Sequence, residues 1–381
     1  MPEQVSRKLP CGRLSRRSVL RSSAVLLSAP FIAKATPVFG QEKLTGSGQV
    51  VVCSYGGSFV ENLRKHVSDP FTKATGISVV DVTADNPEPQ IKAMREAGRF
   101  DWDVAICNAF FPAYAELQQT GEFLPIDYSL WDDEALKGVP APGRLADGVL
   151  AFQNATLLVY DERAFPKGGP KSWADFWNIK DFSGPRGLGV YTFIGSMVFA
   201  LIADGVARKD IWPLTDDKVD RALKKLDQIK PHVSKWWSAG GEPIQLLINR
   251  EYAMTSAADG RAVAAIKKGI PLRMVWDDAT VGDNYWIILK GGPNNANAQK
   301  FIAFVNRAEK AAAFTQATGY PGPNINQLSY LPAELLPLIN INPENAAKTI
   351  RPDYAWWFAK RPDGKTNADH IQERWMAWRA G

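Results

Sequence analysis

The stretch QVVVCSYGGSFVENLRKHVSDPFTKATG, residues 49–76, contains a complete strand–turn–helix pattern. The apolar run Gln49–Cys53 predicts a buried strand. Gly56-Gly57-Ser58 predicts a turn that ends on a helix N-cap, and Phe59–Ala74 has helical spacing. Two more strand–helix pairs follow at Ile77–Val82 with Pro89–Ala97 and at Asp103–Cys107 with Pro112–Gln119. Three consecutive pairs of this kind predict an open, mostly parallel α/β sheet with right-handed crossovers.

A second α/β set follows the extended run Val149–Tyr160. Its expected strands are Gly187–Thr192, Tyr252–Thr255 and Pro271–Trp276, and its longest expected helix is Asp216–Ile229. Tyr285–Leu289 is a last strand, and the remainder reads as mostly helical down to Asn367–Arg379. Two α/β sets joined by extended runs near residues 150 and 280 predict two lobes with a cleft between them.

Four segments are expected to line that cleft, because ligands of open α/β sheets lie at the carboxyl ends of the strands. The segments are Ser54–Ser58, Asn108–Phe111, Thr192–Ser196 and Ala257–Arg261.

The net positive charge of the chain comes entirely from its first 40 residues. They hold seven basic residues and one acidic residue, and removing these from the 45 bases and 40 acids of the chain leaves 38 and 39. Because the remainder has no basic excess, we expect no nucleic-acid partner.

This leader has the order of a secretory signal. Arg16-Arg17 precedes a modestly apolar run, Ala24–Ala33, and small residues follow at Ala33-Lys34-Ala35. The paired arginines resemble the twin-arginine export signal, and an ordinary Sec signal that contains Arg-Arg is the alternative. Either signal predicts export, which in a bacterium means the periplasm. No later stretch approaches 18 apolar residues, so we expect no membrane anchor.

The chain lacks the patterns of common catalytic and metal sites. His66, His232 and His370 lie far apart, and no HExxH, CxxC, GxSxG or phosphate-binding loop occurs. We therefore expect no cofactor, no metal and no enzyme, although an exported hydrolase stays open because catalytic triads are geometric. Cys53 and Cys107 end two expected strands, and the spacing leaves open whether they pair or remain buried free thiols.

Several short runs resemble one family, the spermidine/putrescine-binding group of periplasmic solute-binding proteins of ABC transporters. The runs are Ser172–Trp177 (SWADFW), Tyr320–Asn324 (YPGPN), Trp236–Gly240 (WWSAG) and Gln245–Leu247 (QLL). The resemblance covers most of residues 46–381. It implies a type II periplasmic binding protein: two α/β lobes, a two-strand hinge, and closure around one small solute that is delivered to a membrane permease.

The sequence departs from the polyamine pattern at two places. The segment Thr192–Met197 has no carboxylate, whereas polyamine binders place acidic residues at the equivalent helix start. Ala258-Asp259-Gly260-Arg261 stands where relatives show Trp-Asn-Gly-Arg or Trp-Asn-Gly-Ser. Arg261 suits a carboxylate and Asp259 an ammonium, so this pair matches a zwitterion such as γ-aminobutyrate, which a subgroup of similar chains is reported to bind. The alternative for the pair is a structural helix cap.

Aromatic and hydroxyl side chains complete the expected ligand site. An aromatic ring would cover the solute's methylenes or its ammonium group. The candidates are Trp236, Trp237, Tyr55, Phe110, Trp286 and Ser196, and packing in the core is the alternative for each aromatic residue.

These observations predict a monomeric solute-binding protein of an ABC importer, with permease subunits as partners and a small amine or amino acid as solute. The expected parts are a signal peptide at 1–40, a first lobe from 41–150 and 285–325, and a second lobe from 151–284 and 326–381. Putrescine or spermidine is the alternative solute, and an adhesin is a third class that no repeat or anchor supports.

Overall fold

The computed structural model describes residues 42–190 and 193–381, so the predicted signal peptide lies outside the described residues. All described residues belong to the second of the two units of the chain, Phe39–Gly381. Within the described ranges, no helix is both long enough and apolar enough to cross a bilayer.

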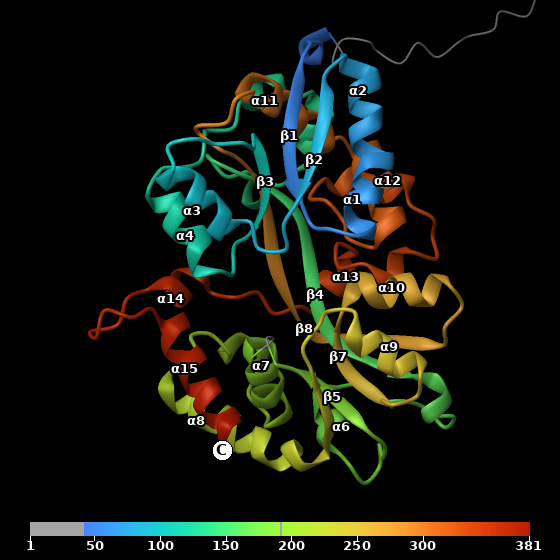
Figure 1. The fold of residues 1–381 in the computed structure, drawn as a ribbon. Helices are drawn as coiled ribbons and strands as arrows, with labels where there is room; N and C mark the ends of the chain where they lie inside the picture. Colours follow the sequence, from blue (N-terminus) through green and yellow to red (C-terminus); the bar gives the residue numbers. More distant parts are fainter. Residues whose placement is uncertain (1–41, 191–192) are drawn as a thin grey trace, which may run out of the picture. The chain divides into compact units, whose positions relative to one another are not determined.

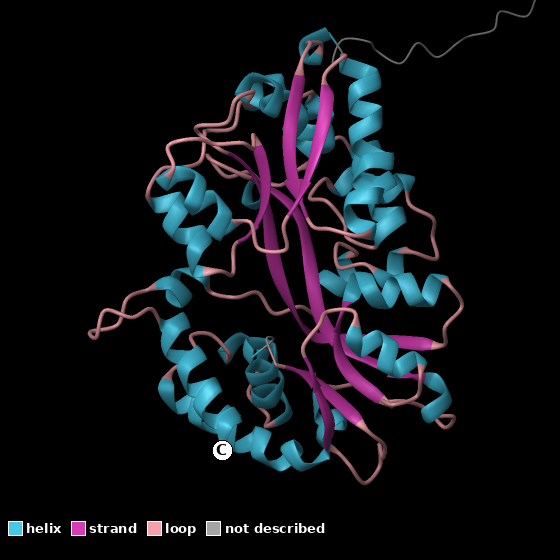
Figure 2. Cartoon of the chain, in the orientation of Figure 1, coloured by secondary structure: helices cyan, strands magenta, loops and turns pink. Residues whose placement is uncertain are grey.

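A single mixed sheet runs through the second unit, and its described strands follow the order β2-β1-β3-β8-β4-β7-β5-β6 (Figures 1 and 2). The strands are β1 (Gln49–Ser54), β2 (Ser78–Thr83), β3 (Val104–Asn108), β4 (Val149–Asp161), β5 (Arg186–Gly189), β6 (Val233–Trp237), β7 (Met254–Ala258) and β8 (Leu272–Ile288). β1 pairs in parallel with β2 and β3, and β5 pairs in parallel with β6 and β7. The predicted parallel strands of the first set are confirmed, and at the other end of the sheet β6, which was not among the expected strands, pairs in parallel with β5.

Helices cover both faces of this sheet (Figure 2). In the first half of the chain they are α1 (Ser58–Leu63), α2 (Asp69–Thr75), α3 (Glu88–Glu96), α4 (Pro112–Gln119), α5 (Asp133–Gly138), α6 (Trp173–Trp177) and α7 (Phe193–Ala203). In the second half they are α8 (Asp216–Ile229), α9 (Glu242–Ile248), α10 (Asp259–Lys267), α11 (Asn295–Val305), α12 (Ala308–Thr318), α13 (Pro343–Ala346), α14 (Tyr354–Phe358) and α15 (Asn367–Ala380).

Local sequence explains where several helices begin and end. A π-helical turn, Arg64–Ser68, joins α1 to α2, and Gly76 ends α2 in the left-handed region at φ 81°. The Ser172 hydroxyl accepts a hydrogen bond from the Asp175 amide at 3.2 Å and caps α6. Thr366 and Asp369 form a capping box at the start of α15.

Two long antiparallel strands connect the halves of the sheet. Near β3, Val149 of β4 is opposite Trp286 of β8, and near β7, Asp161 of β4 is opposite Leu272 of β8. The pair therefore passes from one parallel set to the other, which confirms the predicted two-lobed α/β architecture with a two-strand hinge. We call the half with β1–β3 the first lobe and the half with β5–β7 the second lobe.

The segments Pro271–Trp276 and Tyr285–Leu289, predicted as separate strands, form the two ends of one strand, β8, except for their outermost residues Pro271 and Leu289. A chain segment near residue 350 supports the stretch between them: Ile350 donates a backbone hydrogen bond to Ala279 at 2.7 Å and accepts one from Val281 at 3.1 Å. The C-terminal part of the chain thus runs beside the hinge, a pairing that local sequence does not encode.

Each lobe has its own apolar core. In the first lobe, strands β1 and β3 and helices α2 and α11 bury Val50, Val104, Phe71 and Phe301 in one cluster. In the second lobe, Leu188, Phe199 and Leu226 share a cluster with residues of the C-terminal segment, such as Trp375. A smaller cluster combines Val263 of α10 with Ala312 of α12 and so lies between the two cores.

Candidate ligand-binding site

The first turn of α10 brings the two predicted charged residues next to each other in different environments. Arg261 is exposed, and its guanidinium lies beside the glycines that follow β6. A Cβ atom at Gly240 would be 3.5 Å from Nε of Arg261, and one at Gly241 would be 3.4 Å from one of its terminal nitrogens. Within residues 42–190 and 193–381, Arg261 has no ion pair or hydrogen bond. Its five donors are therefore available to an anion.

Asp259 is fully buried, with 0% of its surface exposed. Its Oδ1 accepts a hydrogen bond from the Gly260 amide at 2.8 Å, its Oδ2 accepts one from Nδ2 of Asn340 at 3.2 Å, and the Ala155 amide also donates to it. Burial raises the pKa of the Asp259 carboxyl from 3.8 to about 7, against the opposing effect of these donors. The side chain ties the start of α10 to β4 and to the C-terminal segment.

Tyr320 lies over the same turn of α10. A Cβ atom at Gly260 would come within 2.5 Å of Cζ of Tyr320, so the ring rests against the glycine backbone. The Tyr320 ring also packs against Phe152, with centroids 5.2 Å apart. Tyr55 reaches Phe152 as well, with centroids 6.1 Å apart. These rings connect the first lobe to the helix that carries Arg261.

Polar hinge side chains adjoin these rings. The Tyr55 hydroxyl donates to Oδ1 of Asn284 at 2.9 Å, and Nδ2 of Asn284 donates to Oδ1 of Asn154 at 2.9 Å. Burial raises the pKa values of the Tyr55 and Tyr320 phenols, so both remain neutral donors at physiological pH. The surface offered to a solute by these hinge groups is uncharged.

The carboxylates next to these groups already have partners. Oε1 of the buried Glu88 accepts from the Asn108 amide at 3.1 Å. Asp283 accepts from Nε2 of Gln153 at 2.5 Å and pairs with Arg351 at 3.5 Å. The site therefore combines one unpaired guanidinium with neutral hydroxyl and amide groups, an arrangement that suits a carboxylate-bearing ligand.

The structure does not bring the predicted tryptophans to this place. Trp236 packs against Trp375 and Trp378 of α15, each with centroids 5.8 Å away, and Trp237 is buried in the hydrophobic core beside α9. Trp286 is buried in the first lobe, edge-on to Phe301. The predicted contacts of these three with a solute remain predictions.

Two further candidates also lie apart from Arg261. Ser196 is fully buried in α7, and its hydroxyl has no hydrogen-bond partner among the described residues. Phe110 stacks on Trp357, with centroids 5.1 Å apart. Of the predicted ligand residues, Asp259, Arg261 and Tyr55 are thus connected through Tyr320 and Phe152.

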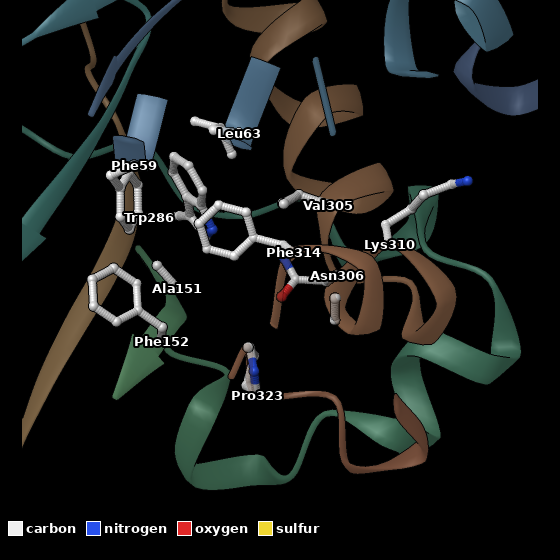
Figure 3. Close-up of a pocket in the computed structure, with 12 residues that line it drawn as sticks. Phe59, Leu63, Ala151, Phe152, Trp286, Val305, Asn306, Lys310, Phe314 and Pro323 are labelled. Carbon is white, nitrogen blue, oxygen red and sulfur yellow. The ribbon is translucent and has the colours of Figure 1, made fainter. Parts of the chain in front are cut away.

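An apolar pocket occupies part of the first lobe (Figure 3). Phe59, Phe152, Trp286 and Phe314 contribute rings to its wall, and Lys310 is the charged residue of its lining. Figure 3 shows the ammonium of Lys310 extending away from these rings. A lining of this kind does not match a zwitterion.

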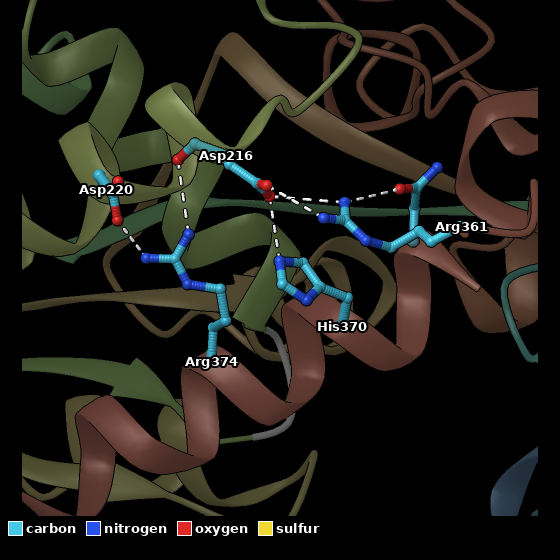
Figure 4. Close-up of polar contacts among 6 residues, drawn as sticks. Asp216, Asp220, Arg361, His370 and Arg374 are labelled. Carbon is cyan, nitrogen blue, oxygen red and sulfur yellow. Dashed lines mark hydrogen bonds and ion pairs between the residues drawn. The ribbon is translucent and has the colours of Figure 1, made fainter. Parts of the chain in front are cut away.

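A polar cluster joins α8 to the C-terminal region (Figure 4). Asp216 accepts from Arg361 at 3.0 Å and contacts Nε2 of His370 at 3.0 Å, and Arg374 pairs with Asp220. The hydrogen bond from Arg361 lowers the pKa of Asp216. His370 is therefore held in an ion-pair network with Asp216 (Figure 4). The described residues contain no group of three or more His, Cys, Asp or Glu that could hold a metal ion.

Tyr320, Asn154, Asn284 and Asn340 were not among the predicted site residues. Tyr320 belongs to a motif noted for its family resemblance, but its contact with Gly260 spans 60 positions of sequence. The three asparagines lie on or beside the hinge, where no local pattern distinguishes a site amide from any other.

The comparisons with known proteins agree with this fold. A model of the bacterial extracellular solute-binding protein family matches residues 66–334. A γ-aminobutyric acid-binding protein of Pseudomonas aeruginosa is 31% identical over 340 residues, which are 88% of this chain and 92% of that protein.

Two solved structures extend the comparison. An ABC transporter protein from Rhodopseudomonas palustris is 33% identical with a TM-score of 0.73, over 87% of this chain and 99% of that one. The binding protein AgtB from A. tumefaciens R10, in complex with agropinic acid, is 32% identical with a TM-score of 0.69, over 88% and 99%.

Proposed function

Because this chain belongs to the bacterial extracellular solute-binding proteins, we propose that it captures a short zwitterionic acid, with γ-aminobutyrate as the first candidate. It is a solute-binding protein of the kind that serves ABC transporters and not an enzyme. We also propose that the protein acts as a monomer and delivers its solute to the permease subunits of an importer.

The observation that carries the choice of solute is the unpaired, exposed guanidinium of Arg261 at the start of α10. A guanidinium binds a carboxylate through two parallel hydrogen bonds, which gives both affinity and orientation. Two of the three relatives named above bind γ-aminobutyric acid and agropinic acid, and both ligands are acids by name.

We propose different roles for the two members of the charged pair. Arg261 contacts the solute carboxylate directly. Asp259 fixes the first turn of α10 against β4, because its carboxylate is fully buried and already accepts hydrogen bonds from three donors. The expected contact of Asp259 with an ammonium group therefore requires the turn to move. Tyr320 and Tyr55 are proposed to cover the methylenes of the solute.

Putrescine or spermidine is the alternative solute class, which the family resemblance suggests. A polycation needs several unpaired carboxylates in a desolvated cleft, and it would meet Arg261 as a like charge. Glu88, Asp259 and Asp283 all have partners, so this alternative is the weaker one.

Calorimetric titration of the purified protein with γ-aminobutyrate, putrescine and spermidine tests the proposal. We expect heat of binding with γ-aminobutyrate and much weaker or no binding with the two polyamines. Native mass spectrometry of the same preparation identifies any copurified solute. Tight binding of putrescine without binding of γ-aminobutyrate would replace the zwitterion by the polyamine.

We further propose that the protein works in the periplasm after export by the twin-arginine route. The support is Arg16-Arg17 ahead of a weakly apolar run. Replacing both arginines with lysine in a tagged chain should abolish delivery to the periplasmic fraction. Undiminished delivery would assign the signal to the Sec route. We also propose that the chain passes from one lobe to the other after residues 150, 284 and 325.

A further inference from the structure

The loop between β3 and α4 in the first lobe carries a side chain that packs against the C-terminal part of the chain. The ring of Phe110 stacks on the ring of Trp357 in α14, with centroids 5.1 Å apart and an interplanar angle of 22°. The indole N–H of Trp357 also donates to the backbone carbonyl of Phe110 at 3.3 Å. One residue pair thus combines ring stacking with a hydrogen bond.

The contact joins the two lobes. Phe110 follows β3, which pairs with β1 and β8 of the first lobe. Trp357 belongs to the core cluster of the second lobe, and Phe110 packs against that cluster as a partly buried member. Because the loop lies at the carboxyl end of β3, on the edge expected to line the cleft, opening of the cleft would pull these rings apart.

The loop of the first lobe holds Phe110 in place. Oδ1 of Asn108 accepts a hydrogen bond from the Phe110 amide at 2.9 Å and forms a tight local turn. The Asn108 amide in turn donates to Oε1 of the buried Glu88. Its sequence neighbour Phe111 is 39% exposed, so the loop directs one ring toward the second lobe and the other toward solvent.

Trp357 is held just as firmly by its own surroundings. Only 1% of its surface is exposed, and its amide donates to the Asp353 carbonyl at 2.8 Å. The ring of Trp212 packs against it in a T-shaped arrangement, with an interplanar angle of 86° and centroids 6.4 Å apart. Contacts that are fixed on both sides gain more from stacking than contacts between mobile side chains, because little side-chain entropy remains to be lost.

We infer that the Phe110–Trp357 contact is an inter-lobe latch that stabilises the closed arrangement of the lobes and so determines how fast a bound solute leaves. Phe110 is a positioning residue in this role, since it acts through lobe closure and not through contact with the solute. The inference rests on the two-lobed fold and does not depend on which solute binds.

Replacing Phe110 with Ala tests the latch in the ligand-free protein. We expect the closed population to fall by about tenfold, which small-angle scattering detects as a larger radius of gyration. Phe110→Leu keeps apolar bulk without the stacked ring, so its radius of gyration should lie between those of Phe110→Ala and the wild type. Phe165→Ala is the matched control, because that partly buried ring contacts Tyr160 and Phe182 inside the second lobe. Identical scattering of Phe110→Ala and wild type would overturn the latch.

Kinetics with γ-aminobutyrate provide the second readout. The dissociation rate of Phe110→Ala should rise by about tenfold while the association rate stays within about twofold, since closure follows the first encounter. Loss of affinity through the association rate alone would contradict the latch. If γ-aminobutyrate does not bind the wild type, the proposed solute is wrong, whereas the ligand-free scattering still decides the latch.

Discussion

The ring of Tyr320 occupies the space that a side chain at position 260 would need. A Cβ atom built on Gly260 would lie 2.5 to 2.8 Å from three carbons of that ring. The ring cannot move away freely, because Phe152 packs against it with centroids 5.2 Å apart. The glycine between Asp259 and Arg261 is therefore required by the close approach of an aromatic ring from another part of the chain.

We expect Gly260→Ala to destabilise the protein by about 1–3 kcal/mol, as for other overpacked core positions. The gain in helix propensity from Gly to Ala is at most about 1 kcal/mol and does not offset the clash. Urea unfolding measures the change. Gly240→Ala is the control, because its Cβ would meet only atoms of Arg261 at 3.5 Å or more. Equal stability of the two variants would show that Tyr320 yields without cost.

Cys53 and Cys107 should be unreactive thiols in the native protein. Both are fully buried and unpaired, and Cys53 of β1 lies opposite Ala105 of β3 and not opposite Cys107. Burial raises the pKa of Cys53 to about 12 and that of Cys107 well above its usual value, so neither forms the reactive thiolate at neutral pH. Alkylation followed by peptide mapping should label these two sites only after unfolding. A peptide pair linked by a disulfide would contradict this prediction.

The fold was largely predictable because local patterns encode it. The helices Pro112–Gln119 and Asp216–Ile229 have the predicted bounds, since each has regular apolar spacing between clear end signals. The hinge strand β4 begins at the predicted residue and ends one residue later than predicted. The alternation of strands and helices then restricts the topology to a few choices.

The site was less predictable because its contacts join distant parts of the chain. Trp236 and Trp237 are neighbours in β6 and point to opposite faces, and α15 covers one of them while the core beside α9 covers the other. Phe110 likewise packs against Trp357, which lies 247 positions away in the sequence. An aromatic residue at the end of a strand carries no local sign of which layer will cover it.

The buried carboxyl of Asp259 should make the stability of the protein depend on pH. Its pKa is about 7 in the folded protein and 3.8 when unperturbed, so between these values the folded state binds a proton that the unfolded state has lost. The contribution of this group to stability is therefore present at low pH and is lost as the pH rises from 4 to 7.

Asp259→Asn isolates this effect, because the amide keeps the size of the side chain but does not titrate. Relative to wild type, the variant should gain up to about 1.4 kcal/mol of unfolding free energy for each pH unit between 4 and 7. Urea unfolding of both proteins at pH 5 and pH 7 gives the difference. A constant difference across this range would mean that the folded pKa of Asp259 is not raised.

Arg261 should control affinity for the proposed solute without contributing to folding. Arg261→Ala is expected to weaken binding of γ-aminobutyrate by about 2–5 kcal/mol, because the solute carboxylate would lose its charged partner when the lobes close around it. Arg261→Lys should recover only part of this loss, since an ammonium cannot form the two parallel hydrogen bonds of a guanidinium. Thermal unfolding should be nearly unchanged, because Arg261 has no ion pair or hydrogen bond within the described part of the chain.

Arg273→Ala, the control for Arg261→Ala, removes a different exposed arginine, paired with Glu162, and should leave binding of γ-aminobutyrate unaffected. Calorimetry on the three variants decides the matter: an unchanged dissociation constant for Arg261→Ala would remove Arg261 from the site, and an equal loss for Arg273→Ala would show that only net charge is sensed.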